Sequence, residues 1–146
     1  MQRTTRYQAA ILRDGHILLI RITILDTGKN IWVIPGGGQE PGESEKECVV
    51  REAYEETNLV VEVENFLMKE PDTAGSTYQD RKTYACKIIS GNPSPGCEPE
   101  PEASSLYAIT AVRWVDLQDE ESWGAEITGD PITFPQLQKI RELTAI

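Results

Sequence analysis

The sequence predicts an α/β protein in which helices cover a mixed β-sheet. Segments rich in β-branched and apolar residues stand both before and after one strongly patterned helix at residues 44–57. Strands on both sides of a central helix favour a sheet that is covered by helices. With 146 residues, 39% hydrophobic and 26% charged, the chain is long enough to bury one hydrophobic core. We therefore expect a single domain over residues 1–146.

The first expected elements form a β-hairpin. Residues 7–13 and 17–25 are rich in β-branched and apolar side chains, and the Asp-Gly sequence between them is a strong turn signal. A second turn leads to a short strand at residues 31–34. The Pro-Gly-Gly-Gly sequence behind that strand predicts a loop over residues 35–42.

The best-defined element is a helix from Ser44 to Thr57. Ser44 and Glu47 fit the capping box, in which each side chain accepts a hydrogen bond from the backbone N–H of the other residue. Asn58 stands where a residue in the left-handed conformation ends a helix. Apolar or small side chains are expected on one side of the helix: Val49, Val50, Ala53, Tyr54 and Thr57.

Further strands and a terminal helix are expected in the second half of the chain. Residues 59–68, 77–89 and 112–116 have strand composition, and residues 135–143 predict a helix with Leu137, Ile140 and Leu143 inward. Residues 90–105 are too rich in Pro, Gly and Ser for regular structure. That segment is either a loop near a site or a tolerated surface insertion, and we favour the insertion because long loops cost little entropy.

Composition argues against several classes of function. The net charge of −10 makes nucleic acid an unfavourable partner, because phosphate backbones need clustered Lys and Arg. We see neither a membrane-spanning run nor a signal-peptide pattern, and expect a cytoplasmic protein. Three widely spaced cysteines predict reduced thiols, and a single histidine gives a catalytic triad little support.

The glycine-rich loop does not match the common phosphate-binding motifs. Residues 37–44 have the glycine spacing and final serine of a P-loop, but Glu43 takes the position of the lysine. A carboxylate there would repel the phosphates that such a loop binds. Pro41 stands where the third glycine of a dinucleotide fingerprint would be.

Acidic side chains gather on one face of the expected helix. Glu52, Glu55 and Glu56 fall within an arc of about 100°. Arg51 lies one turn before Glu55, and Glu43 can fold back from the preceding loop. Such a cluster alone is most often a solvated helix face. Converging carboxylates without matching cations favour a divalent ion, and oxygen ligands select hard cations such as Mg²⁺.

A fixed spacing links these acids to the glycine loop. The pattern G-x5-E-x7-R-E-U-x-E-E-x-G-U, with U a bulky apolar residue, is the signature box of Nudix hydrolases, and the segment over residues 37–59 resembles it. The matching positions are Gly37, Glu43, Arg51, Glu52, Glu55, Glu56 and Leu59. Asn58 replaces a glycine and tolerates the left-handed conformation, and Ala53 replaces a larger apolar residue. The flanking sequences WVIPGG and VRWVDL are also similar to strands of this family.

The resemblance implies a Nudix-type α/β/α sandwich with a mixed sheet and a catalytic loop-helix-loop. It implies hydrolysis of the diphosphate linkage of a nucleoside diphosphate linked to another moiety, with Mg²⁺ as cofactor and Mn²⁺ as a possible substitute. The metal ligands that it implies are Glu52, Glu55, Glu56 and the carbonyl of Gly36. The catalytic residues that it implies are Glu55, Glu56, Arg51 and Glu43, with Glu55 as the favoured base and Arg51 as the residue that orients it. Any acidic ligand outside the box is unassigned.

Two aromatic residues are candidates for binding the substrate. Tyr78 and Trp123 lie in expected loops or at loop edges, where each could stack on a nucleobase or equally cap the core. Trp32 and Trp114 are expected in the core. The expected partner is a small-molecule nucleoside diphosphate derivative, and a homodimer is left open. The alternative is a non-hydrolytic Nudix-fold domain that binds a nucleotide and regulates, but the complete set of acids favours an enzyme.

Overall fold

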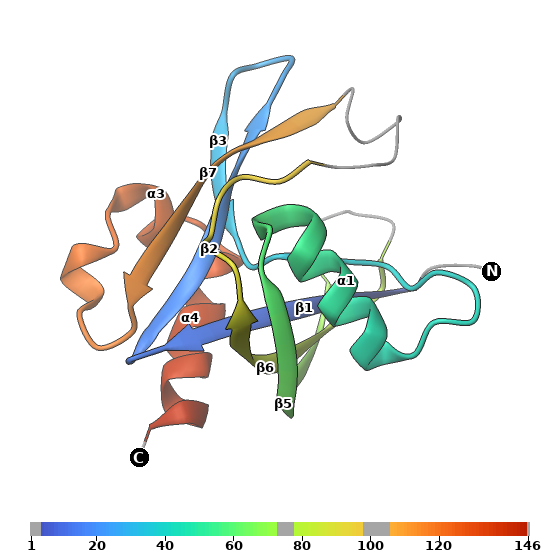
Figure 1. Ribbon diagram of the computed structural model, residues 1–146. Helices are drawn as coiled ribbons and strands as arrows, with labels where there is room; N and C mark the ends of the chain where they lie inside the picture. Colours follow the sequence, from blue (N-terminus) through green and yellow to red (C-terminus); the bar gives the residue numbers. More distant parts are fainter. Residues whose placement is uncertain (1–3, 73–77, 98–105, 146) are drawn as a thin grey trace.

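The computed structural model describes residues 4–72, 78–97 and 106–145, and Figure 1 shows a mixed sheet with helices on both sides. The strands are β1 Thr5–Arg13, β2 His16–Ile24, β3 Asn30–Val33, β4 Gly36–Gly37, β5 Val60–Pro71, β6 Asp80–Ser90 and β7 Tyr107–Asp116. The helices are α1 Glu45–Thr57, the short 3-10 helix η1 Glu120–Ser122, α3 Ala125–Thr128 and α4 Thr133–Thr144. The predicted α/β/α architecture is confirmed.

The seven strands form one mixed sheet with the order β3-β2-β1-β6-β5, while β4 pairs with β1 and β7 pairs with β2. β1 and β6 run parallel from the Thr5 and Asp80 pair to the Ile11 and Cys86 pair. The other strand pairs are antiparallel. The sequence predicted a mixed sheet, and this parallel pair makes it one.

The paired part of the hairpin between β1 and β2 is short. The two strands separate beyond it, which leaves room for the glycine loop. Asp14 and Gly15 have φ angles of 51° and 79°, which suit the tight turn. Only two pairs follow, Leu12 with Ile17 and Arg13 with His16. Beyond them β1 continues beside β6 and β2 beside β3 and β7, so β4 can pair with the start of β1.

Each face of the sheet carries its own core cluster. Cys48, Val49 and Ala53 of α1 are fully buried against one face. On the other face Leu137 and Ile140 of α4 pack in a cluster that includes Trp32, Ile34 and Ile127. Figure 1 shows α1 on one side of the sheet and α3 with α4 on the other. These two layers bury both sides of the strands that hold the glycine loop.

Three details of the helices differ from the sequence prediction. Tyr54 is 56% exposed and Leu143 is 42% exposed, so neither packs inward as expected. Each lies at the edge of its helix's apolar stripe, where the sheet no longer covers it. Helix α4 begins at Thr133 rather than Pro135, and Asp130 Oδ1 accepts hydrogen bonds from the N–H groups of Ile132 and Thr133 at this start. The predicted free thiols are confirmed, with Cys48 and Cys86 buried and Cys97 exposed.

Candidate active site

Both ends of α1 are fixed by the residues that predicted them. Ser44 Oγ accepts a hydrogen bond from Glu47 N at 3.1 Å, and Glu47 Oε1 accepts one from Ser44 N at 2.9 Å, which completes the capping box. Asn58 ends the helix in the left-handed conformation with a φ of 63°. These two ends set the phase of the helix and thereby the direction in which its acids point.

Arg51 gathers three carboxylates around one guanidinium. Its Nε donates to Glu43 Oε2 at 2.7 Å and its Nη2 to Glu43 Oε1 at 3.1 Å, a bidentate pair. Its Nη1 donates to Glu52 Oε1 at 3.0 Å and to Glu55 Oε2 at 3.1 Å. Nη2 also donates to the carbonyl of Gly38 at 2.9 Å. The prediction that Glu43 folds back and that Arg51 orients Glu55 agrees with these contacts.

Arg51 and Glu43 shift each other's pKa values. Hydrogen bonds from Arg51 lower the pKa of Glu43, although partial burial acts in the opposite direction. Its bonds to the carboxylates, that to Glu43 first, raise the pKa of Arg51, which stays charged. Glu40 Oε1 lies 3.7 Å from Arg51 Nη1 as a fourth carboxylate, so acids outnumber the guanidinium at this point of the site.

Glu52 and Glu56 lie against the glycine loop and are almost completely buried, at 6% and 2% exposed. Glu56 Oε1 accepts a hydrogen bond from Gly36 N at 2.7 Å. A Cβ atom on Gly37 would lie 2.3 Å from Glu52 Oε1, and one on Gly36 would lie 2.4 Å from the Tyr7 carbonyl. Only glycine fits at these two positions, because backbone and carboxylates approach so closely.

The donor atoms suit a hard divalent cation, since they are carboxylate and carbonyl oxygens. Within residues 4–72, 78–97 and 106–145, no three His, Cys, Asp or Glu side chains converge as a metal-binding cluster. Glu52 and Glu55 point oxygens at Arg51, and the Gly36 carbonyl accepts a hydrogen bond from Arg6 Nη1 at 3.0 Å. The buried carboxylates of Glu52 and Glu56 nevertheless supply the negative charge that such a cation neutralises. The residues therefore fit the ion by their chemistry, and the ligand set stays a prediction.

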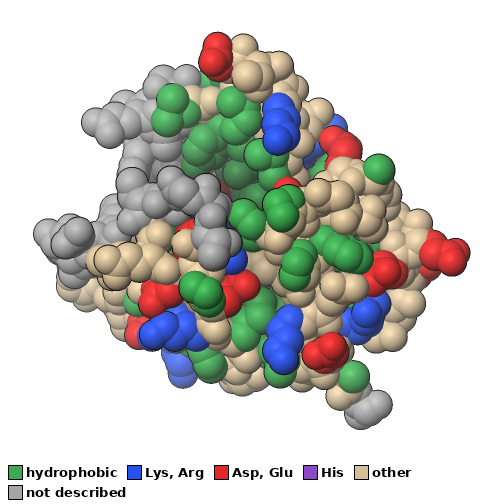
Figure 2. Space-filling model, turned by 180° about the vertical axis from the view of Figure 1, so that it is seen from behind, with side chains coloured by type: hydrophobic (Ala, Val, Ile, Leu, Met, Phe, Trp, Pro, Cys, Tyr) green, Lys and Arg blue, Asp and Glu red, His purple; other side chains and the backbone are tan. Residues whose placement is uncertain are grey.

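A cavity of about 570 Å³ opens in front of the glycine loop and Glu52. Its walls come from β1, β2, β3, the loop before α4, and α4 itself. Apolar side chains of Ile22, Ile31, Val33 and Ile132 share the lining with the charged groups of Arg6 and Arg81. The back of the molecule is hollowed, and hydrophobic side chains line the hollow (Figure 2). The combination of apolar walls and a few polar groups is typical of small-molecule sites.

The two aromatic candidates have different places in the fold. Tyr78 lines the cavity that also contains Glu52, so its role in substrate binding stays a prediction. Trp123 is fully buried in the core cluster beneath α3 and α4, and its Nε1 donates to the carbonyl of Asp116 at 2.6 Å. The prediction that Trp123 binds substrate is wrong, because its ring has no exposed face on which a base could stack. Trp32 lies in the core as predicted, at 7% exposed.

Several cavity residues were missed because no local motif contains them. Arg6 and Gln8 on β1, Arg81 on β6 and Gln136 on α4 all line the cavity, although they are up to 130 residues apart in sequence. The available signal was the period-2 alternation of β1, in which Arg6 and Gln8 interrupt an apolar strand on the same face. No comparable signal identifies Arg81 or Gln136, because their meeting depends on the parallel pairing of β1 with β6 and on the docking of α4.

The segment 91–97 lies against the end of α1. Ser94 N, Gly96 N and Cys97 N donate to the last helix carbonyls at 2.9–3.0 Å, those of Thr57, Glu56 and Glu55. These bonds satisfy acceptors that a helix end leaves free. For these described residues, the sequence interpretation as a surface insertion is wrong, because they hold the backbone of two active-site glutamates. Residues 98–105 of the expected loop lie outside the described residues.

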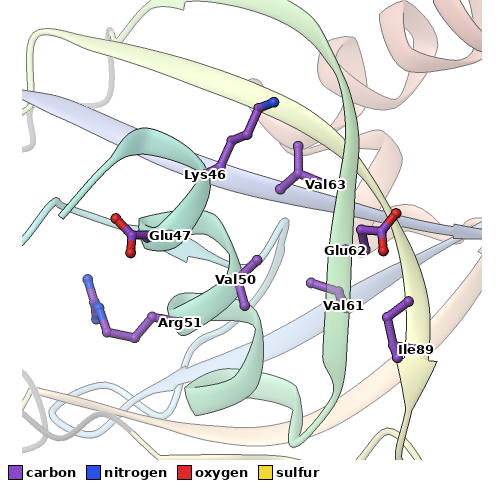
Figure 3. A pocket seen from close by; sticks show the side chains of 8 residues that line it. All are labelled: Lys46, Glu47, Val50, Arg51, Val61, Glu62, Val63 and Ile89. Carbon is purple, nitrogen blue, oxygen red and sulfur yellow. The ribbon is translucent and has the colours of Figure 1, made fainter.

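A second hollow, of about 520 Å³, lies on the outer side of α1 (Figure 3). Val50 of α1 and Val61 of β5 face each other there, with Ile89 of β6 beside them. Arg51 is the one residue that this groove shares with the carboxylate network, and neither Glu52 nor Glu56 lines it. We therefore place the reacting group in the cavity at the glycine loop.

Comparison with known proteins gives the same assignment over most of the chain. The NUDIX domain model matches residues 3–134. A NUDIX hydrolase from Nitrosomonas europaea has a similar solved structure, with a TM-score of 0.73 and 20% sequence identity. The match covers 96% of this chain and 89% of that one. At this identity the likeness concerns the fold.

Two curated relatives are similar in sequence. Nudix hydrolase 1 of Caenorhabditis elegans is 30% identical over 125 residues, which cover 83% of this chain and 31% of that protein. A nucleoside triphosphate pyrophosphatase/Nudix hydrolase fusion protein of Bifidobacterium longum is 32% identical over 88 residues, 60% of this chain and 17% of that protein. The matches therefore span less than a third of the length of either relative.

Among the described residues, none of the helices combines the length and hydrophobicity that crossing a bilayer requires.

Proposed function

The chain belongs to the NUDIX family, and we propose that it is a Mg²⁺-dependent hydrolase that cleaves the diphosphate linkage of a nucleoside diphosphate derivative. Nudix hydrolases use a divalent metal, which agrees with the oxygen donors at the glycine loop. The observation that carries the proposal is the burial of Glu52 and Glu56 against the glycine loop, beside a cavity large enough for a nucleotide that Glu52 and the glycines line. A cation bound beside them would offset the free-energy cost of burying these two carboxylates.

We assign a role in this reaction to each of the acidic side chains. Glu52 and Glu56 would hold the cation, with Glu55 and the Gly36 carbonyl as the further predicted ligands. A bound Mg²⁺ would screen the phosphate charges and act as a Lewis acid on a phosphoryl oxygen. Arg51 and its partner Glu43 keep Glu55 in one orientation.

For water to attack phosphorus, one group of the protein must accept a proton from that water. A water oxygen forms a bond to phosphorus, the bond from that phosphorus to the bridging oxygen breaks, and a carboxylate receives the proton of the water. We assign Glu55 as the carboxylate that accepts this proton. Its side chain is 22% exposed, whereas Glu52 and Glu56 are buried against the glycine loop. The Arg51 guanidinium at 3.1 Å orients the accepting oxygens.

The test is hydrolysis of a panel of nucleoside triphosphates, ADP-ribose, nucleotide sugars and dinucleoside polyphosphates. We expect turnover with Mg²⁺ or Mn²⁺, none with chelator, and a fall of about 10³-fold in kcat for Glu56→Gln. Glu62→Gln, an exposed glutamate on β5, is the matched control and should keep full activity.

Two outcomes would contradict the proposal. Turnover that survives chelation removes the metal from the mechanism. Tight nucleotide binding without turnover of any compound identifies the chain as a non-hydrolytic binding or regulatory domain.

A further inference from the structure

Two buried amide side chains meet at the wall of the cavity. Gln8 of β1 is 2% exposed and Gln136 of α4 is 3% exposed, and both line the cavity. Gln136 Nε2 donates to Gln8 Oε1 at 3.2 Å, although the two residues are separated by 128 positions in the sequence. Buried glutamines are uncommon and are expected to use their hydrogen-bonding groups.

A neighbouring carboxylate determines which way each amide faces. Gln136 Nε2 lies 2.7 Å from Glu70 Oε1, and an ionised carboxylate only accepts hydrogen bonds. The NH₂ group of Gln136, not its oxygen, must therefore face Glu70. The guanidinium of Arg81 forms an ion pair with the same Glu70 oxygen at 3.3 Å. Because the second hydrogen of Gln136 Nε2 points at Gln8, Gln8 must present its oxygen.

This arrangement leaves one donor group and one acceptor without protein partners. Among the described residues, nothing hydrogen-bonds to Gln8 Nε2 or to Gln136 Oε1. The fully enclosed side-chain atoms without partners in the same residues are Arg81 Nε and Thr83 Oγ1. Gln8 Nε2 and Gln136 Oε1 are not enclosed in this way and belong to residues that line the cavity. They therefore offer a donor beside an acceptor to whatever occupies it.

The cavity that the pair lines also has apolar walls and reaches the glycine loop. Ile132 lines it from the residue before α4, and Val33 lines it from β3. Gln8 is the direct strand partner of Gly36, which bonds Glu56. A planar ring placed between these walls would have apolar faces against them and its polar edge at the two amides.

We propose that the Gln8–Gln136 amide pair determines specificity by binding the edge of a nucleobase that carries a hydrogen-bond acceptor next to a donor. Gln8 Nε2 donates to the acceptor of the base, and Gln136 Oε1 accepts from its donor. This assignment rests on the proposed function, since it concerns the same cavity. A ribose hydroxyl also donates and accepts, and the experiment below separates it from the base.

The test measures binding, which does not depend on turnover. Isothermal titration of AMP, GMP, CMP and UMP into the wild-type protein identifies the best-bound base, and ribose 5-phosphate serves as the probe without a base. In Gln136→Met, which keeps the length of the side chain without its amide, the affinity for the best nucleoside monophosphate should fall about tenfold, the loss expected for about 1.4 kcal/mol of hydrogen bonding. The affinity for ribose 5-phosphate should stay unchanged.

A second variant addresses the donor alone. Gln8→Glu can still accept the bond from Gln136 Nε2 but replaces the NH₂ group with a carboxylate oxygen. We expect this variant to weaken the binding of the nucleoside monophosphate more than the binding of ribose 5-phosphate. The change for ribose 5-phosphate measures the effect of the added charge alone. Gln138→Met is the matched control, because Gln138 lies on the same helix outside the cavity and bonds Glu120. Thermal melting of each variant verifies that it is folded.

Three results would overturn the assignment. If the affinity for ribose 5-phosphate falls by the same factor, the amides bind the sugar rather than the base. Unchanged binding of nucleoside monophosphates in both folded variants, or no binding of any of them by the wild-type protein, removes the amides from base recognition. Base-dependent binding without hydrolysis of any diphosphate leaves the amide assignment standing and contradicts the proposed function instead.

Discussion

At the scale of single residues, Arg51 connects the acids of the helix to the glycine loop. It reaches Glu43, Glu52, Glu55 and the carbonyl of Gly38 with one guanidinium. Lysine carries the same charge but lacks the planar set of donors that makes these contacts possible. The orientation of the carboxylates therefore depends on the shape of the side chain as well as on its charge.

Arg51→Lys is expected to lower kcat by about 10²-fold with little change in KM. The variant keeps a positive charge in the cluster but lets Glu55 and Glu52 move from their positions, which costs rate rather than binding. Steady-state kinetics with the preferred substrate measure both constants. Arg13→Lys, at an exposed arginine that lies over Trp114, is the control. A rise in KM at constant kcat would instead make Arg51 a substrate-binding residue.

Glu43 should make the stability of the fold depend on pH in the acid range. Its folded-state pKa is lowered mainly by the hydrogen bonds from Arg51. A carboxyl with a depressed folded pKa stabilises the protein above its unfolded pKa of about 4.3, and that stabilisation is lost as the pH falls through the folded pKa. The free energy of unfolding should therefore decrease as the pH falls below the unfolded pKa of this carboxyl.

The variant Glu43→Gln removes the titrating group and is expected to flatten part of this decrease. Urea unfolding at a series of pH values measures the difference between the two proteins. Glu64→Gln, at an exposed glutamate of β5, should leave the pH profile of the wild type unchanged. Parallel profiles for Glu43→Gln and the wild type would show that the bond to Arg51 contributes nothing to folding.

At the scale of elements, α1 acts as a rigid carrier whose end is held by a distant segment. The capping box fixes its start, and the N–H groups of Ser94, Gly96 and Cys97 bond its last carbonyls. The helix dipole places partial negative charge at this end, so these donors are favourable there. The carbonyls that they hold include those of Glu55 and Glu56, whose side chains lie in the site.

Gly96→Ala is expected to destabilise the fold and to reduce kcat. A Cβ atom at this position would lie 1.8 Å from the carbonyl oxygen of Glu55, so the segment or the helix end must move. We expect the free energy of unfolding to fall by about 1–3 kcal/mol and kcat to fall with it. Asn92→Ala, an exposed position in the same segment, is the control. Wild-type stability and activity in Gly96→Ala would mean that the segment does not position the helix.

At the scale of the whole molecule, the excess negative charge and the buried acids should make the fold sensitive to divalent cations. The net charge is −10, Glu52 and Glu56 are both buried, and Glu52 belongs to the carboxylate network of Arg51. An ion that binds the folded state alone, at a hundred times its Kd, stabilises by about 2.7 kcal/mol. For a domain of this size that corresponds to a rise of roughly 5–10 °C in Tm.

Mg²⁺ should therefore raise Tm well above the value in NaCl of the same ionic strength. Differential scanning calorimetry of the wild-type protein and of Glu56→Gln measures this effect. The variant should lose most of the rise, because one predicted ligand no longer carries a charge. An equal rise in both salts would indicate general screening of the −10 charge instead of a specific site.

Local sequence patterns predicted the parts of the site that lie within one segment. Ser44, Glu47 and Asn58 define the helix from both ends, and the spacing of Arg51 and the glutamates follows from 3.6 residues per turn. The same patterns failed where the burial of a side chain depends on which other elements pack against it. Trp123 was considered for base stacking and is in the core, while Tyr54 and Leu143 were expected inside and are exposed.

The sequence by itself determined the helix, its acids and the family to which the chain belongs, because each of these depends on residues close together along the chain. Only the tertiary structure decided which residues form the cavity in front of those acids. Gln8 and Gln136 meet there because β1 pairs with β4 and β6 and because α4 packs on that face of the sheet. Contacts between such distant positions depend on the packing of the layers, for which no local spacing rule exists.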